Sequence, residues 1–438
     1  MIPTLSGTPL LGNLLEMRQD WLALLRRIPE ECGDIGRIRL GPRSGVVFNT
    51  PTAAQTIFIE EHDAFEKGPT LRRLVRVFLG DGLLTCTQAH HLRLRRLLGP
   101  TFSPQRMQGY AAMMAAAARD ARAALVPGVV DIHALLMSIA VRVAGRALFS
   151  AEMAERAPTL EKAVSDALDY VAYGVAHPIR PPLWAPTAIN RRARAARATF
   201  DAIFSEMIDA RRAAPDDRGD VLSSLLAARD VDDAPLSDAE IRDQLATLML
   251  TGFETAAAAM AWILALLAER PDVEQRLLAE VDALPADPCA EHIESLSYCK
   301  QILNEALRLC PPAHTLGRRA LRPVTVDGHT IATGEVVVVS PWLLHRRPDH
   351  FPDPERFEPE RFAPERIGAL PRCAYIPFGA GPRACIGQRF STVEVQIVLA
   401  TLLRRFRFRP LCPTRPRASL SMTMRPDNLK VEVAERWR

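Results

Sequence analysis

The chain has 438 residues, of which 48% are hydrophobic and 24% are charged, so it is neither disordered nor of low complexity and can form a large core. Its 55 Lys and Arg residues against 51 Asp and Glu residues give a formal net charge of +4, which is too small at this length to indicate a nucleic-acid-binding protein. These values predict a globular protein of one large domain or a few ordinary ones.

The eight Cys residues are spread along the chain without a Cys-x-x-Cys pair. This spacing favours a reducing compartment, the cytoplasm, over a disulfide framework or a zinc site. The first nine residues contain neither a basic segment nor an apolar stretch, so we expect neither a secretory signal nor a membrane anchor.

A β-hairpin is predicted over residues 35–49, where Ile38 and Leu40 alternate with arginines before a Gly/Pro turn. A second strand signal lies at residues 324–340, which include Asp327-Gly328, a dipeptide favoured in hairpins. Most of the chain between them is rich in Ala, Leu and Arg and is interrupted by Pro, a pattern typical of helices. We therefore predict a mostly α fold with a minor β portion.

A long helix is predicted across the apolar segment Leu245–Ala268. Ser237 and Glu240 ahead of it have the spacing of a capping box, and Pro271 closes it. The segment is long enough to cross a membrane, but Glu254 at its middle costs roughly 2.5–3.5 kcal/mol at a bilayer centre. We therefore favour a central core helix over a transmembrane span.

Glu305 and Arg308 lie three residues apart on a predicted helix, so that their side chains share a face and can pair. The spacing alone is a weak indication, because it recurs elsewhere in the chain. A buried ion pair also needs further partners. Two Pro-Glu-Arg-Phe segments follow, at residues 354–357 and 359–362, and each offers another arginine.

A glycine-rich loop at residues 378–387 is followed by a helical pattern, which places Cys385 where the loop enters the helix. The helix dipole and the free backbone N–H groups at that point favour a thiolate over a thiol. Gly379, Gly381 and Gly387 let the backbone fold closely around the sulfur. A thiolate held in this way suits a metal, whereas an isolated cysteine at a helix start is more often a core residue.

The segment 378–387 resembles the signature Phe-Gly-x-Gly-x-Arg/His-x-Cys-x-Gly of the cytochrome P450 family, and all six fixed positions match. The context of Glu305 and Arg308 is similar to the family helix that lies about eighty residues ahead of its cysteine. The motifs follow the family's order over nearly the whole chain. The resemblance implies one domain over residues 1–438 with the triangular haem-monooxygenase fold, haem b as cofactor and Cys385 as the iron ligand.

The resemblance also implies a structural triad, in which Glu305 and Arg308 are joined by an arginine of a Pro-Glu-Arg-Phe segment. Arg361, 24 residues before Cys385, has the expected spacing. The role of these three residues would be to shape the loop that carries the cysteine.

Two haem propionates require cations, and the resemblance implies four residues for them. His91 and Arg95 are one helical turn apart and can reach one carboxylate. For Arg93 and Arg96 we expect a solvated basic face instead. The implied haem-binding residues are His91, Arg95, Arg318 and Arg383 for the propionates, and Phe378, Gly379 and Gly387 in the cysteine loop.

The stretch Thr251-Gly252-Phe253-Glu254-Thr255 resembles the family's oxygen-activation motif, Ala/Gly-Gly-x-Asp/Glu-Thr. Thr251 departs from that motif and either crowds the oxygen site or adds a hydroxyl. The resemblance makes Gly252, Glu254 and Thr255 the catalytic residues. Gly252 would leave space beside the helix, the Thr255 hydroxyl would hold dioxygen or water, and Glu254 would pass protons inward.

The implied activity is that of a monooxygenase, which inserts one atom of O2 into an apolar small organic substrate. Only 51 residues follow Gly387, so we expect electrons from a separate ferredoxin or flavodoxin with an NAD(P)H-dependent reductase. Arg93, Arg96 and Arg389 are expected to form a basic patch for that partner. A haem peroxygenase is the nearest alternative, although peroxide-using relatives generally lack the acid–alcohol pair. A haem gas sensor is the alternative from a different class, and it usually carries an output domain.

The expected substrate pocket is mainly apolar with a few hydroxyls. This composition predicts an apolar or amphipathic substrate such as a terpenoid, a fatty acid or a natural-product intermediate. The segments implied by family position are residues 71–84, 170–177, 245–251, 313–316 and 421–424.

Overall fold

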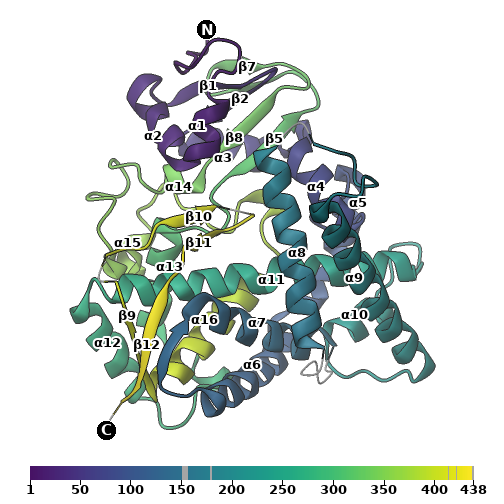
Figure 1. Cartoon of the computed structure of the whole chain (residues 1–438), viewed down its shortest axis with the longest axis vertical. Coiled ribbons are helices and arrows are strands. Elements are labelled where there is room, and N and C mark those ends of the chain that lie inside the picture. Colours follow the sequence, from purple (N-terminus) through teal and green to yellow (C-terminus); the bar gives the residue numbers. More distant parts are fainter. Residues whose placement is uncertain (150–155, 178–179, 413, 421, 437–438) are drawn as a thin grey trace. The chain divides into compact units, whose positions relative to one another are not determined.

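The structure, a computed structural model, describes residues 1–149, 156–177, 180–412, 414–420 and 422–436 (Figure 1). Ser421, at the edge of one expected pocket segment, lies outside the described residues. Internal contacts divide the chain into two compact units. Unit 1 comprises Met1–Arg73, Arg308–Arg356 and Pro364–Cys385, and unit 2 comprises Leu74–Leu307, Phe357–Ala363 and Ile386–Arg438. A single domain over residues 1–438 stays a prediction.

Unit 1 is built on a five-stranded sheet. Its strands are β1 (Ile35–Leu40), β2 (Arg43–Phe48), β3 (Phe65–Lys67), β5 (Leu316–Ala320) and β8 (Val336–Val339), in the order β1-β2-β8-β5-β3. The predicted hairpin over residues 35–49 is confirmed, because β1 and β2 pair antiparallel from Ile35 opposite Phe48 to Leu40 opposite Arg43. β8 pairs parallel with β2 and antiparallel with β5.

The second predicted hairpin is also present in unit 1. β6 (Val324–Val326) and β7 (His329–Ile331) pair antiparallel around the Asp327-Gly328 turn. Both turn residues have positive φ angles, 44° and 75°, as a two-residue type I′ turn requires.

Unit 1 also contains short helices. Its hydrophobic core includes Val46 and Phe48 of β2 and Ile57 and Phe58 of η1, all buried. The helices are α1 (Leu14–Gln19), α2 (Trp21–Glu31), α3 (Pro51–Gln55), η1 (Thr56–Glu60), η2 (His62–Ala64), α14 (Pro341–Leu344), α15 (Pro364–Ile367) and η6 (Gly381–Arg383).

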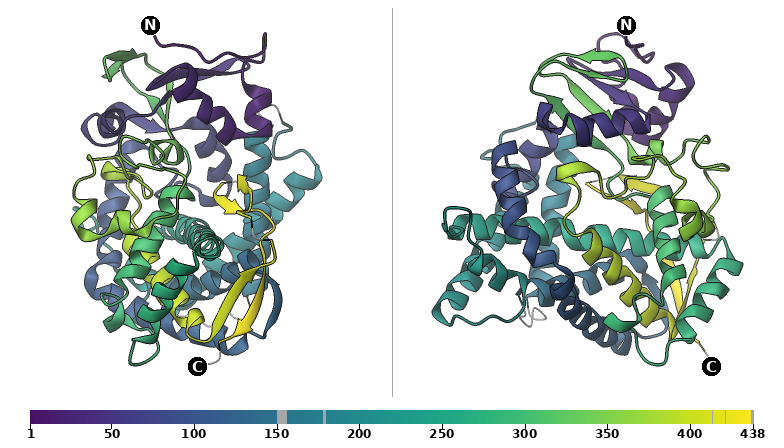
Figure 2. Two further views of the ribbon diagram at one scale, coloured as in Figure 1. Left: turned by 90° about the vertical axis from the view of Figure 1, so that its left-hand side faces the viewer. Right: turned by 180° about the vertical axis from the view of Figure 1, so that it is seen from behind.

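Unit 2 is organised around α11 (Asp238–Leu267), a helix of 30 residues. The predicted capping box is confirmed, because the Ser237 hydroxyl accepts the N–H of Glu240 and the Glu240 carboxylate accepts the N–H of Ser237. α7 (Ile132–Phe149), α9 (Ala188–Ala213) and α16 (Gln388–Leu403) pack against it, and the left view of Figure 2 looks nearly along its axis.

Within the described chain, α7 and α11 are the two helices that are apolar and long enough to cross a membrane. In α11, 83% of the most apolar 18-residue window is buried inside the protein, and in α7 61%. This burial agrees with the predicted core helix.

Further helices and two small sheets complete unit 2, while α4 (Pro69–Leu79) and α13 (Ser297–Leu309) each contribute residues to both units. The strands form the sheets β4-β12-β9 and β10-β11, from β4 (Gly128–Asp131), β9 (Phe406–Pro410), β10 (Ala418–Leu420), β11 (Met424–Pro426) and β12 (Lys430–Glu435). The remaining helices are α5 (Gln88–Leu98), η3 (Gly99–Phe102), α6 (Pro104–Ala124), α8 (Ala157–Ala176), α10 (Val221–Ala227), α12 (Pro271–Asp282), η4 (Ala290–His292) and η5 (Pro359–Phe362). The fold is therefore mostly α with a small β portion, as predicted.

Candidate functional site

Cys385 lies in unit 1, in the loop between η6 and the start of α16 three residues later, and it is exposed. Its backbone N–H donates to the carbonyl oxygen of Phe378 at 2.8 Å. Two shorter turns flank the two ends of this segment. One runs from Gly379 N–H to Ile376 C=O at 3.0 Å and the other from Ala384 N–H to Gly381 C=O at 2.9 Å. Backbone hydrogen bonds thus hold the sulfur-bearing residue at the tip of an ordered loop.

Two glycines of this loop adopt a conformation that other residues avoid. Gly379 and Gly381 have φ angles of 72° and 70°. A Cβ on Gly381 would also lie 1.8 Å from the carbonyl oxygen of Phe58 in η1, which anchors the loop against the rest of unit 1. Gly387, in contrast, has an ordinary φ of −88° and caps α16 through its carbonyl, so the structure shows no backbone reason for glycine there.

Gly381→Ala is expected to destabilise the cysteine loop, because the change adds backbone strain and a clash with Phe58. Gly334→Ala is the matched control, since Gly334 has a φ of 83° but nothing within 4 Å of its added Cβ. The positive φ costs roughly 1–2 kcal/mol at either position, and the clash should cost roughly 1–3 kcal/mol more at Gly381. Urea unfolding of both variants measures the difference, and equal losses of stability would contradict the close approach.

Arg318 and Arg383 form a cationic cluster in unit 1. Arg318 on β5 is 9% exposed, and its guanidinium lies 4.7 Å from the centre of the Phe58 ring. Burial, and secondly the charge of Arg383, lower the pKa of Arg318 to about 10. Among the residues that the structure describes, no carboxylate lies within 4.0 Å of the Arg318 guanidinium. A buried cation next to a like charge fits an anionic ligand, and the carboxylate of a haem propionate is of that chemistry.

Glu305 on α13 is fully buried in unit 2 and is held by the second Pro-Glu-Arg-Phe segment. Its Oε1 accepts the backbone N–H of Glu358 at 2.9 Å and lies 3.5 Å from Nε of Arg361. Of the two candidate arginines, Arg361 therefore supplies its side chain to Glu305.

Arg308, also on α13 and fully buried, belongs to unit 1. Its guanidinium donates to the backbone carbonyls of His345 at 3.0 Å, Pro354 at 2.7 Å and Arg356 at 3.1 Å. The first Pro-Glu-Arg-Phe segment thus contributes backbone oxygens rather than an arginine side chain. Three carbonyl acceptors offset the cost of burying this cation.

The middle of α11 has one open face in unit 2. Gly252 is exposed, and a Cβ added to it would meet nothing within 4 Å. Thr251 and Thr255 beside it are half-buried. The Thr255 hydroxyl donates to the carbonyls of Thr251 at 3.0 Å and Gly252 at 3.1 Å, and the Thr251 hydroxyl donates to Thr247 C=O at 2.7 Å. The two hydroxyls are thus tied to the helix backbone next to open space.

Glu254 lies one residue from that face but its side chain is 1% exposed. Its Oε1 accepts the hydroxyl of Thr423 at 2.8 Å, and Oε2 has no hydrogen-bond partner among the described residues. Burial raises the pKa of Glu254, against smaller lowering effects of Thr423 and Arg425. A carboxyl kept neutral in this way can store a proton.

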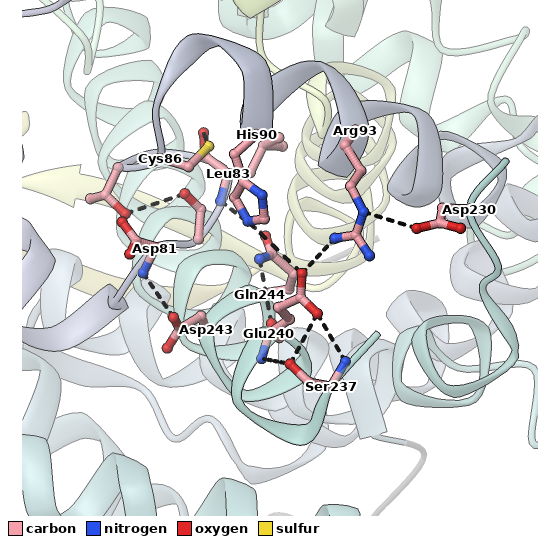
Figure 3. Close-up of polar contacts among 12 residues, drawn as sticks. Asp81, Leu83, Cys86, His90, Arg93, Asp230, Ser237, Glu240, Asp243 and Gln244 are labelled. Carbon is pink, nitrogen blue, oxygen red and sulfur yellow. Dashed lines mark hydrogen bonds and ion pairs between the residues drawn. The ribbon is translucent and has the colours of Figure 1, made fainter. Parts of the chain in front are cut away.

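His91 and Arg95 occupy one face of α5, one turn apart, with His91 2% exposed and Arg95 half-buried. The expectation for Arg93 was wrong, because Arg93 is not part of a solvated face. Its guanidinium is bound to Asp230 at 3.2 Å and to Glu240 on α11 (Figure 3). Arg93 therefore joins α5 to the first turn of the central helix.

Sequence reasoning missed a second connection to α11 (Figure 3). Asp243 accepts the backbone N–H of Asp81 at 2.8 Å, and the Gln244 side chain accepts that of Leu83 at 2.9 Å. A Cβ on Gly82 would lie 2.0 Å from the Thr247 hydroxyl, so only glycine fits there. The loop after α4, an expected pocket segment, is thus fixed on α11.

Glu394 on α16 is a buried acid that sequence reasoning did not single out. It is 2% exposed, and its Oε1 has no hydrogen-bond partner among the described residues. Burial raises the pKa of Glu394 to about 8 from an ordinary value of 4.5. The folded protein therefore holds this proton at pH values where the unfolded chain has released it.

Glu394→Gln is expected to flatten the pH dependence of stability. Between pH 4.5 and about 8 the folded state binds one proton more than the unfolded state, so wild-type stability falls as pH rises through this window. One such proton accounts for up to about 1.4 kcal/mol per pH unit. The test compares urea midpoints at pH 5.5 and 7.5 for wild type, Glu394→Gln and Glu432→Gln. Glu432→Gln is the control, because Glu432 is exposed. An unchanged wild-type slope in Glu394→Gln would show that the carboxyl titrates normally.

An exposed cysteine on a glycine-bearing loop can bind haem iron through its thiolate, and two clustered arginines in the same unit can bind an anionic group. The Cytochrome P450 family pattern matches residues 2–433. The chain is 36% identical to cyclooctatin synthase of Streptomyces melanosporofaciens over 433 residues, 96% of this chain and 93% of that protein. It is 33% identical to cyclooctat-9-en-7-ol 5-monooxygenase of the same organism over 413 residues, 92% and 89%.

A solved structure, retinoic acid bound cyanobacterial CYP120A1, matches with a TM-score of 0.89 at 27% identity and covers 99% of both chains. The chain belongs to the cytochrome P450 family. It is an oxidoreductase that incorporates oxygen from O2, and its cofactor is haem b.

Proposed function

We propose that this protein is a cytoplasmic monooxygenase that hydroxylates or epoxidises an apolar terpenoid, with Cys385 as the iron ligand. Haem bound to a thiolate supplies an oxidant able to attack unactivated C–H bonds. The observation that carries the assignment is the cysteine loop, in which the Cys385 amide is held by Phe378 and the thiol stays exposed.

The other site residues have proposed roles that follow from their surroundings. Arg318 and Arg383 bind one propionate, because the buried Arg318 has no carboxylate within 4.0 Å of its guanidinium in the described chain and the charge of Arg383 lies close to it. His91 and Arg95 bind the other from one face of α5. The Thr255 hydroxyl holds dioxygen or water at the open face of α11, and Glu254 stores a proton and passes it inward.

A terpenoid substrate is proposed from the relatives and from the open face of α11. One relative is named for a cyclic alkenol, cyclooctat-9-en-7-ol, and the solved structure for retinoic acid, so both names describe mainly hydrocarbon molecules with one polar group. At the open face beside Gly252, the hydroxyls of Thr251 and Thr255 are both already bonded to the backbone. A hydrocarbon skeleton suits such a surface because it requires no hydrogen bonds.

The test is a spectral screen followed by isotope labelling. Cyclic terpene hydrocarbons and alcohols should shift the haem spectrum at lower concentrations than fatty acids of equal carbon number. With the binding compound, ¹⁸O₂, NADPH and a ferredoxin system, the product should carry one labelled oxygen atom. Product that takes its oxygen from added peroxide but not from O2 would identify a peroxygenase, and spectral shifts without any product would favour a sensor.

Electron supply is proposed to come from an acidic ferredoxin or flavodoxin that docks on unit 2. With Arg93 neutralised by Asp230 and Glu240, the remaining expected contacts are Arg96 and Arg389, both exposed. Surface charges act mainly on the association rate and are screened by salt. Arg96→Glu with Arg389→Glu should therefore slow first-electron transfer most at low ionic strength, and an unchanged rate would exclude this docking surface.

A further inference from the structure

His345, immediately after α14 in unit 1, is fully buried and has an unusual hydrogen bond. Its Nε2 accepts the backbone N–H of Ile376 at 2.8 Å. A backbone amide can only donate, so Nε2 carries no proton, and the neutral imidazole holds its proton on Nδ1.

Further contacts fix both the ring and the backbone of His345. Its carbonyl accepts a hydrogen bond from Nη1 of Arg308 at 3.0 Å. The imidazole lies against the Tyr375 ring at 5.0 Å and approaches the edge of Phe351 at 6.5 Å, measured between ring centres. These contacts leave the imidazole little freedom to turn Nε2 away from the Ile376 amide.

Ile376 lies two residues before the cysteine loop and is hydrogen-bonded to it. Its carbonyl accepts the N–H of Gly379 at 3.0 Å, and the carbonyl of Phe378, two residues further on, accepts the N–H of Cys385 at 2.8 Å. Ile376 itself is 4% exposed, so its amide has no access to bulk water. Without an acceptor on His345, that buried N–H would be unpaired, and the loop would have to shift to satisfy it.

We propose that His345 is a positioning residue for Cys385: as a neutral hydrogen-bond acceptor it fixes Ile376 and thereby the loop that presents the sulfur. The path runs within unit 1 from Arg308 through the His345 backbone and imidazole to Ile376, and then through the loop turns to Cys385. This role deepens the proposed function and depends on Cys385 being the iron ligand.

If His345 acts as a hydrogen-bond acceptor, its variants should behave differently than if it only fills space in the core. His345→Gln places an amide oxygen at a similar distance along the side chain and can still accept from Ile376. His345→Leu has comparable volume but no acceptor. His350→Leu is the matched control, because His350 lies in the same stretch and is half-buried, but its Nε2 lies 3.7 Å from the Asp349 carboxylate.

Two measurements on the full chain test the proposal. Amide exchange, with and without haem, should be roughly five- to tenfold faster at residues 376–379 in His345→Leu than in wild type, and near wild type in His345→Gln and His350→Leu. In urea, the reduced carbon monoxide complex of His345→Leu should lose its thiolate band at a lower concentration than it loses helical circular dichroism. Wild type should lose both together.

The outcomes separate this proposal from the ligand assignment. The acceptor role is wrong if amide exchange at residues 376–379 is as fast in His345→Gln as in His345→Leu. It is also wrong if neither variant changes that exchange. If the exchange effect is present but Cys385→Ala keeps the thiolate band, the hydrogen bond exists and the ligand assignment is wrong. Should His345→Leu not fold, an unprotected Ile376 amide in wild type would still overturn the proposal, and a protected one in His345→Gln would support it.

Discussion

Cys385→Ala is expected to abolish the red-shifted Soret band that the reduced protein shows with carbon monoxide. That band requires a thiolate bound to the haem iron, and alanine would have no sulfur to supply it. The loop itself should persist in the variant, because its hydrogen bonds at Phe378 and Gly381 use backbone atoms only. Loss of the band should therefore be complete while far-UV circular dichroism and urea stability stay close to wild type.

Cys373→Ala is the matched control for this result. Cys373 lies in the same stretch of unit 1, twelve residues earlier, but it is buried, and burial raises the pKa of its thiol. A protonated, enclosed sulfur is not available to a metal. The Cys373 variant should keep the band. If the Cys385 variant retains the thiolate band and loss of another cysteine removes it, the assignment of the ligand is wrong.

The sequence predicted those features that depend on neighbouring residues. The hairpin at residues 35–49 follows from a two-residue alternation, and the start of α11 follows from the Ser237–Glu240 capping box. The turn at Asp327-Gly328 follows from the ease with which these residues adopt positive φ. Each prediction uses information that lies within a few residues, and each is confirmed.

The features that the sequence did not predict depend on partners that lie far away along the chain. Arg93 looked like a surface arginine because its partners, Asp230 and Glu240, lie 137 and 147 residues away. Glu254 similarly meets Thr423 across 169 residues. Arg308 binds backbone carbonyls, which no residue pattern identifies. The site chemistry could be assigned by family motifs, but the protonation and pairing of its groups depend on burial that only the folded chain shows.

Glu254 is buried and Thr255 lies at the open face of α11, so we expect different effects from changing each of them. Glu254→Gln retains an oxygen that can accept from Thr423 and resembles the neutral carboxyl that burial favours. The variant should fold with wild-type stability and keep the carbon monoxide spectrum. Because an amide cannot release the stored proton, turnover should slow and the solvent isotope effect should increase. Unchanged turnover would show that protons reach the site by another route.

Thr255→Ala is expected to uncouple NADPH consumption from product formation. The hydroxyl lies at the open face of α11 beside Gly252, where it can turn from its bonds to Thr251 and Gly252 carbonyls toward oxygen or water. Without it, oxygen is reduced but not directed to the substrate, and it should be released as hydrogen peroxide. General acid–base assistance is worth about 10²–10⁴-fold, and water can replace part of it, so product per NADPH should fall by about tenfold or more.

Thr247→Ala controls for effects on the helix, because the Thr247 hydroxyl makes the same type of bond, to the Asp243 carbonyl at 2.7 Å, two turns earlier. It should leave coupling unchanged, whereas loss of coupling in both variants would indicate a general distortion of α11. If Thr255→Ala keeps wild-type coupling, the Thr251 hydroxyl is the next group along the same face, and Thr251→Ala combined with Thr255→Ala would reveal it. Loss of the O2- and NADPH-driven product in that double variant, with peroxide-driven product retained, would show that the O2 route needs one of the two hydroxyls. Wild type that forms product with peroxide but none with O2 and NADPH would instead identify a peroxygenase.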